Sequence, residues 1–176
     1  PTAGSFWRYA GISGTEVWRK GEKRPWNADL KKLCFLIGES FVKVSGKEQA
    51  FYGQLYKQRK ALENDRNNNG LFAEQAANQL AAKNYRDGTV TRGWLEKGML
   101  SPAQIHARAR RYAVKIFLSH LHEVMYKTIL GKNPPAPYAI AILGHAHQLA
   151  VPNPQNIRKF VQEIELDSIE STEDDN

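Results

Sequence analysis

The sequence lacks the features that define several large protein classes. Its single cysteine, Cys34, rules out an internal disulfide framework, and no apolar run of about 18 residues could span a membrane. It contains neither a Walker-type Gly-rich loop nor a Gly-x-Ser-x-Gly elbow. Sustained alternation of apolar and polar residues, typical of half-buried strands, is also missing. The sequence therefore predicts a mainly α protein of a reducing compartment, with Cys34 packed inertly on a helix.

Acidic residues are sparse where a nuclease would need them. The carboxylates of the basic parts of the chain are isolated: Glu16, Glu22, Asp29, Glu39, Glu48 and Glu123. None has the paired spacing that two-metal phosphoryl transfer requires. We therefore expect no cofactor in this segment.

Positive charge is concentrated in two blocks. Residues 1–60 hold 12 Lys and Arg against 5 Asp and Glu, and residues 100–135 hold 6 against 1. Residues 61–99 balance at 5 against 5, whereas residues 136–176 carry 2 against 7. Basic blocks attract polyanions, and the usual polyanion inside a cell is nucleic acid. The alternative interpretation is a solvated surface with a chance excess of lysine.

Capping residues predict where three helices begin. Thr2 is expected to cap a short helix that runs to Tyr9, and Asn27 a second, basic helix with a carboxylate in its first turn. Ser101, followed by proline at the first helical position, predicts a long helix that runs to about Leu130.

Apolar spacing predicts the remaining elements and the buried faces. We expect helices over 47–68 and 71–83, an irregular segment over 84–100 with one turn around Trp94-Leu95, an extended segment or small hairpin over 138–150, and a short helix near 154–165. The helix after Asn27 is expected to bury Leu30, Leu33, Ile37, Phe41 and Val44. The helix over 47–68 is expected to bury Phe51, Leu55 and Leu62, and the long helix Ile105, Ala109, Tyr112, Ile116 and Val124.

The segment from Gly11 to Lys32 is the strongest candidate site. Its glycines let the backbone approach phosphates, and its arginines and lysines neutralise them. Trp18 and Trp26 could stack on bases or plug the edge of the core. The predicted DNA contacts are Arg19, Lys20, Lys23, Arg24, Lys31 and Lys32, with Trp18, Trp26 and, from the long helix, Arg108, Arg111 and Lys115.

Residues 1–45 carry a resemblance to a known family. Phe6-Trp7-Arg8-Tyr9-Ala10-Gly11-Ile12, then Gly21, Lys23-Arg24 and Asn27-Ala28-Asp29-Leu30-Lys31-Lys32-Leu33, resemble the C-terminal, helix-hairpin-helix type domain of the Piv/MooV insertion-sequence transposases. Those proteins join this domain to an upstream RuvC-like DEDD domain, and the resemblance implies that any Mg²⁺ ion of the parent protein would belong to that upstream domain. Residues 107–126, which include Arg108, Arg110, Arg111 and Lys115, are similar to the terminal basic helix of the family.

The resemblance implies a DNA-binding domain over residues 1–150, in which residues 46–100 are a helical insertion. Residues 151–176 would add a short helix and a disordered acidic tail. Because the chain starts at Pro1 with neither Met nor a signal sequence, we expect its N-terminus to be a cut inside a longer protein. Such a protein would be cytoplasmic, in a bacterial or phage-infected cell.

The sequence departs from this family at the proposed nucleophile. The resemblance implies a Ser-Gly in the loop whose serine attacks DNA, but Arg19 and Lys20 stand there, and Ser13 is nearby but out of register. Arginine has no lone pair to attack with, yet it binds phosphate bidentately. We therefore expect a segment that binds DNA without cutting it, and leave open whether the parent protein is an enzyme.

Histidines form the other candidate constellation. His120 and His122 are two apart on a predicted helix and point in different directions, whereas His145 and His147 would share a face of an extended segment. Two ligands are too few for a metal site, and structural histidines are the commoner outcome. We therefore expect no metal.

Two alternatives to the DNA-binding hypothesis stay open. One is an active recombinase domain in which Ser13 does covalent work. The other is a helical interaction protein of a phage or mobile element, in which residues 46–100 and the acidic tail bind protein partners. The acidic tail could also compete with DNA for the basic surface. RNA binding and homo-oligomer formation are left undecided, and no membrane partner is expected.

Overall fold

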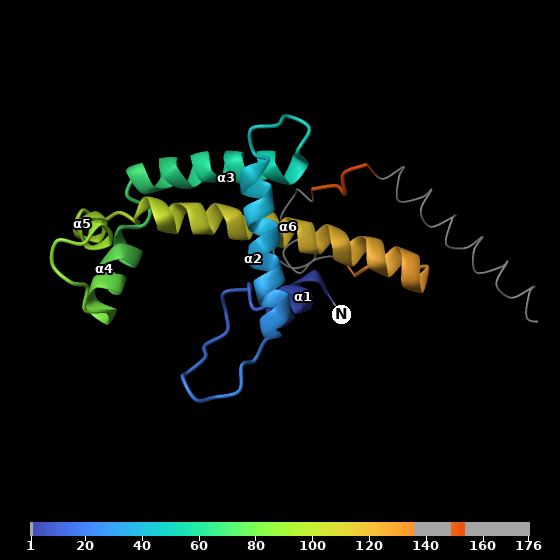
Figure 1. Cartoon of the computed structure of the whole chain (residues 1–176), viewed down its shortest axis with the longest axis horizontal. Coiled ribbons are helices and arrows are strands. Elements are labelled where there is room, and N and C mark those ends of the chain that lie inside the picture. The colour runs from blue at the N-terminus through green and yellow to red at the C-terminus, as the bar shows by residue number, and fades with distance from the viewer. Residues whose placement is uncertain (1, 136–148, 154–176) are drawn as a thin grey trace, which may run out of the picture. The chain divides into compact units, whose positions relative to one another are not determined.

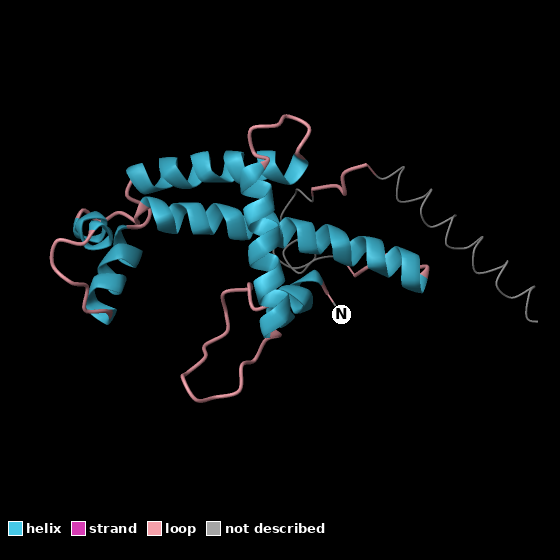
Figure 2. Ribbon diagram, viewed as in Figure 1, coloured by secondary structure: helices cyan, strands magenta, loops and turns pink. Residues whose placement is uncertain are grey.

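The computed structural model describes residues 2–135 and 149–153 (Figure 1). This part of the chain contains no strand (Figure 2), so the prediction of a mainly α protein is confirmed. The expected tail, the helix near 154–165 and most of the expected extended segment lie outside the described residues. The helices are α1 (Ala3–Tyr9), α2 (Ala28–Lys43), α3 (Phe51–Asn68), α4 (Ala73–Ala82), α5 (Val90–Glu96) and α6 (Pro102–Leu130).

The three predicted helix starts are confirmed. Thr2 and Asn27 each accept a hydrogen bond from the backbone N–H three residues further on, at 3.3 and 2.8 Å. Ser101 and Gln104 form a reciprocal capping box, in which Ser101 Oγ accepts from Gln104 N and Gln104 Oε1 accepts from Ser101 N. Within the described ranges no helix is long and apolar enough to cross a membrane.

The chain divides into two compact units. The first comprises Pro1–Trp26 and Ile116–Asn176, and the second is Asn27–Lys115, so that the boundary falls inside α6. Residues 46–100, the expected insertion, lie wholly in the second unit. They pack there against α2 and against the first part of α6.

In the second unit, α3 and the first half of α6 lie side by side and antiparallel (Figure 1). Two apolar clusters hold this unit together. Around the start of α6, the buried residues are Phe72, Ala76, Leu95, Leu100 and Ile105. Between α3 and α6 they are Tyr56, Ala109 and Ala113, with Phe41 and Val42 of α2 packed against them.

The predicted buried face of α2 is wrong at one position, Leu33. Leu33 is 51% exposed, whereas Cys34 and Gly38 are buried. A Cβ at Gly38 would lie 2.7 Å from Cγ of Arg110, so the helices approach where α2 carries its smallest side chains. Apolar spacing predicted that the large residues of α2 are buried, but close helix packing buries its small residues instead.

The predicted face of α3 is wrong at Leu62, for a related reason. Leu62 is 42% exposed, and the buried positions are Gly53, Tyr56, Glu63 and Asn67. The side-chain amide of Asn67 donates to the carbonyl of Leu100 at 2.9 Å and accepts from its N–H at 2.8 Å. This paired bond fixes the end of α3 to the residue before α6.

Glu63 is the buried charge of the second unit, with 1% exposure. Its carboxylate accepts a 2.7 Å hydrogen bond from Arg108 Nε and lies 2.5 Å from Arg59 Nη2. Arg108 also covers the ring of Phe72 at 4.5 Å, and Arg59 the ring of Tyr112 at 4.6 Å. Burial acts to raise the pKa of Glu63, but Arg108 and Arg59 outweigh it and hold that pKa below its usual value.

The segment over 84–100 is predicted to be irregular except for one turn around Trp94-Leu95, and the structure has the longer helix α5 at that place. Leu95 of this helix is 1% exposed and belongs to the core around Leu100. Arg92 forms ion pairs with Asp87 and Glu96 and donates to the carbonyl of Tyr85 at 3.0 Å. These contacts within a short stretch compensate for its weak apolar periodicity.

Replacing Glu63 by glutamine should destabilise the second unit. Glu63→Gln leaves Arg59 and Arg108 without their buried counter-charge, so we expect a loss of about 3 kcal/mol, the lower end for breaking a buried ion pair. The measurement is the free energy of unfolding in urea. Asp65→Asn, an exposed change of the same charge on the same helix, is the control. Equal losses in the two variants would contradict this role of Glu63.

The pH dependence gives an independent check of the same ion pair. Because the folded pKa of Glu63 lies below its ordinary value of 4.5, its contribution to stability is present above about pH 4.5. That contribution is lost as the pH falls further, through the folded pKa. The unfolding free energy of Glu63→Gln should therefore fall less on acidification than that of the unaltered chain.

Candidate nucleic-acid interface

The predicted site begins where α1 ends. Gly11 has φ +64°, and its N–H donates to the carbonyl of Arg8. A Cβ at Gly11 would lie 2.6 Å from Cγ of Trp26, so the absence of a side chain lets the indole pack against the backbone. This contact closes residues 12–25 into a loop within the first unit. We call residues 17–26 the basic loop.

The tip of the basic loop is a tight turn. The N–H of Glu22 donates to the carbonyl of Arg19 at 3.2 Å, and Gly21 has φ +97°, as the third residue of a type II turn requires. The carboxylate of Glu22 accepts from the N–H of Arg19, and the indole N–H of Trp18 donates to the carbonyl of Glu22 at 2.8 Å. The only acid of the loop is thus used to order it.

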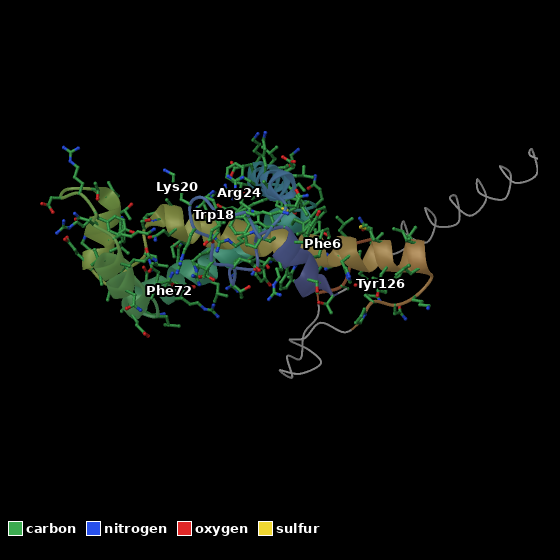
Figure 3. All side chains as sticks on the ribbon, turned by 90° about the horizontal axis from the view of Figure 1, so that it is seen from below. Phe6, Trp18, Lys20, Arg24, Phe72 and Tyr126 are labelled. Carbon is green, nitrogen blue, oxygen red and sulfur yellow. The ribbon has the colours of Figure 1, made fainter. Side chains whose placement is uncertain are left out.

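Four cations lie at this turn: Arg19, Lys20, Lys23 and Arg24. All four are exposed, and none forms an ion pair with another described residue. Figure 3 shows Lys20 and Arg24 beside Trp18. With Glu22 as the one acid, residues 17–26 carry a charge of 4 − 1 = +3. The loop is therefore an ordered, concentrated positive surface.

The two tryptophans have different environments. Trp26 is half-buried against Gly11, so it is mainly a packing residue. Trp18 is 37% exposed and contacts Trp26 edge-on, with ring centroids 6.4 Å apart. The guanidinium of Arg24 lies over the Trp18 ring, 5.6 Å from its centroid. Of the two indoles, Trp18 is the one accessible to a ligand.

Ser13, the weak candidate nucleophile, lies in a turn near the basic loop. Its hydroxyl donates to Glu16, which also pairs with Arg8 at 3.4 Å. The hydrogen bond from Ser13 holds the pKa of Glu16 below its usual value. A carboxylate of lowered pKa is a weaker base, so this geometry orders a turn and does little to activate the hydroxyl.

The cations of the second unit that are predicted to contact DNA differ in exposure and in their partners. Arg108 forms an ion pair with Glu63 and lies over the ring of Phe72, so it is part of the core of that unit. Lys31 and Lys115 are half-buried and have further partners. Lys32 and Arg111 are exposed and form no ion pair with a described residue. The neighbouring Arg110 forms an ion pair with Glu39, and its guanidinium lies 4.2 Å from the centroid of the Phe35 ring.

The histidines occupy structural environments. His120 is 4% exposed, and its Nε2 lies 2.9 Å from the carbonyl oxygen of Leu149. His106 Nδ1 lies 2.8 Å from the hydroxyl of Tyr56, and burial, aided by Arg110 and Lys60, lowers the pKa of His106. Over residues 2–135 and 149–153, no three metal-ligating side chains gather. The His145 and His147 pair lies outside these ranges.

Sequence reasoning missed how the loop is ordered. In the sequence Glu22 is an isolated carboxylate, but in the structure it accepts hydrogen bonds from the backbone N–H of Arg19 and the indole N–H of Trp18. The signal was its place directly after Gly21, in a stretch otherwise made of cations. No comparable sequence signal identifies Glu63 as the partner of Arg108, because the two residues are 45 positions apart.

Comparison with protein-family models, curated proteins and solved structures gives no match to this chain.

The contact between Gly11 and Trp26 can be tested with a matched pair of glycines. Gly11→Ala and Gly14→Ala both place a Cβ at positive φ, which costs about 1 kcal/mol. Only Gly11→Ala also drives that Cβ into Trp26, because nothing lies within 4 Å of the position at Gly14. We expect Gly11→Ala to lose about 1–3 kcal/mol more in the free energy of unfolding. Equal losses would contradict the close packing of Trp26.

Proposed function

We propose that this chain binds DNA through the basic loop, as the C-terminal domain of a transposase- or recombinase-like protein. The observation that carries the proposal is the cluster of four exposed cations on an ordered turn, none of which has an acidic partner among the described residues. Four like charges within six residues repel one another, and a polyanion that bridges them relieves the repulsion. An ordered loop also loses little conformational entropy on binding.

The arrangement favours contacts to the phosphate backbone over contacts to base edges. Arg19 and Arg24 provide planar guanidinium groups suited to bidentate phosphate contacts, and Lys20 and Lys23 provide point charges. The exposed face of Trp18 adds a flat surface for a base or a sugar. We therefore propose strong salt dependence and weak sequence preference.

The assignment to a transposase-like parent rests on the resemblance of residues 1–45. Two features of the fold support it: Asn27 starts α2 where the family pattern places a helix, and an ordered loop precedes it. Because Arg19 and Lys20 replace the Ser-Gly of the family, and Ser13 is held by Glu16, the proposed role of this domain is binding. Strand cleavage would be the task of residues elsewhere in the parent protein.

The salt dependence of duplex binding tests the proposal. Four phosphate contacts predict a slope of about −3.6 for the logarithm of the association constant against the logarithm of salt concentration. The double variant Lys20→Gln, Lys23→Gln should lower the magnitude of that slope by about 2 and weaken binding to all sequences alike. Fluorescence anisotropy with a labelled duplex measures both quantities.

The matched control removes the same charge elsewhere. Lys47→Gln, Lys57→Gln changes two exposed lysines outside the basic loop and should leave the slope unchanged. If the unaltered chain fails to bind duplex DNA at low salt, the proposal is wrong. If both double variants lose the same affinity, binding reflects net charge alone and the assignment to the basic loop is wrong.

A further inference from the structure

An apolar groove lies in the first unit between α1 and the last turns of α6. Its volume is about 490 Å³, and its apolar walls are Phe6 and Tyr9 of α1 with Met125, Tyr126, Ile129 and Leu130 of α6. Figure 3 shows Phe6 on α1 and Tyr126 toward the end of α6. Contiguous apolar surface of this kind marks an interaction site.

The groove offers apolar contact and little charge. Tyr9, Met125, Ile129 and Leu130 are between 44% and 69% exposed, so an occupant would bury a large apolar area. No charged side chain among the described residues lines the groove, and the nearby Glu123 and Lys127 pair with each other at 2.6 Å. The occupant must therefore present apolar side chains.

The same chain carries a segment with that pattern. Ile157, Phe160, Val161 and Ile164 follow one another at the i, i+3, i+4, i+7 spacing of one helix face, while Leu166 falls on the opposite face. These residues lie outside the described ranges, so the pattern is read from the sequence alone. The face has the length of the groove: seven residues of helix rise about 10 Å, and α6 rises about 12 Å from His122 to Leu130.

The chain returns to α6 close to the groove. The hydrogen-bond contact between His120 Nε2 and the carbonyl oxygen of Leu149, at 2.9 Å, places residue 149 beside the turn of α6 that precedes His122. Asn153 is the last described residue of this stretch, and the four residues from it to Ile157 span at most about 14 Å, about the length of the groove. This short connection keeps the segment close to α6.

A second apolar stretch, residues 138–143, fits the groove less well. Its sequence, Tyr-Ala-Ile-Ala-Ile-Leu, alternates like a strand and follows Pro134, Pro135 and Pro137, which oppose a helix. An extended chain laid against apolar walls would leave backbone N–H and C=O groups unpaired, whereas a helix satisfies its own.

We propose that the groove between α1 and α6 binds residues 157–164 of the same chain as an amphipathic helix, through Ile157, Phe160, Val161 and Ile164. This interaction does not depend on DNA binding. It would bury the exposed apolar side chains of the groove and hold the chain after Asn153 against α6.

Disulfide trapping in the full chain tests which segment occupies the groove. In a Cys34→Ala background, Met125→Cys is combined with Phe160→Cys, with Leu166→Cys as the opposite-face control, or with Ile140→Cys for the competing segment. Mild oxidation should give a rapid intramolecular bond for the first pair, seen by non-reducing electrophoresis and peptide mass spectrometry. The other two pairs should link at least several-fold more slowly.

Three results would overturn the proposal. Equal rates for the pairs with Phe160→Cys and Leu166→Cys would show unselective collision. A faster bond with Ile140→Cys would assign the groove to residues 138–143. Bonds formed only between two molecules would assign it to a second copy of the chain.

A measurement without engineered cysteines complements the trapping. Phe160→Asp should raise the fluorescence of the apolar dye ANS and lower the melting temperature, because a carboxylate cannot enter the groove. Leu166→Asp, on the opposite face, should change neither, and far-UV circular dichroism checks that both variants fold. Identical dye binding and melting in the two variants would contradict the proposal.

Discussion

The ion pairs of the buried Glu63 constrain much of the structure. A carboxylate with 1% exposure is tolerated only if cations neutralise it, and Arg59 and Arg108 do so from α3 and α6. Both arginines then cover aromatic rings, so each contributes charge and packing to the same region. The second unit is therefore organised around a polar centre flanked by two apolar clusters.

This constraint decides which positive charges are available to a ligand. By sequence alone, α6 has a face of Arg108, Arg111 and Lys115 that resembles a basic DNA-binding helix. In the structure Arg108 forms an ion pair with Glu63. The adjacent Arg110 forms an ion pair with Glu39 and lies over the ring of Phe35. The basic loop differs, because its one acid is engaged with the backbone of Arg19 and its four cations have no acidic partner among the described residues.

Local chemistry could be predicted from the sequence, and long-range packing could not. Caps at Thr2, Asn27 and Ser101 fixed the starts of three helices because capping involves residues three apart. The buried faces of α2 and α3 were mispredicted because Gly38, Glu63 and Asn67 are not apolar markers. Their burial depends on Arg110, Arg108 and Leu100, which are distant in sequence. The exposure of the basic loop follows from its composition, but the different environments of Trp18 and Trp26 depend on Gly11.

The central claim is that the basic loop is the DNA contact, and the tryptophan side chains test it in the unaltered protein. The four indole N–H groups, of Trp7, Trp18, Trp26 and Trp94, give separate signals in a ¹⁵N–¹H spectrum. Because the indole of Trp18 donates to Glu22 between the four cations, a phosphate bound there changes its surroundings directly. We expect a short DNA duplex to shift the Trp18 signal most and to leave that of Trp94 in α5 unmoved. A Trp18 signal that stays in place at saturating duplex would contradict the claim.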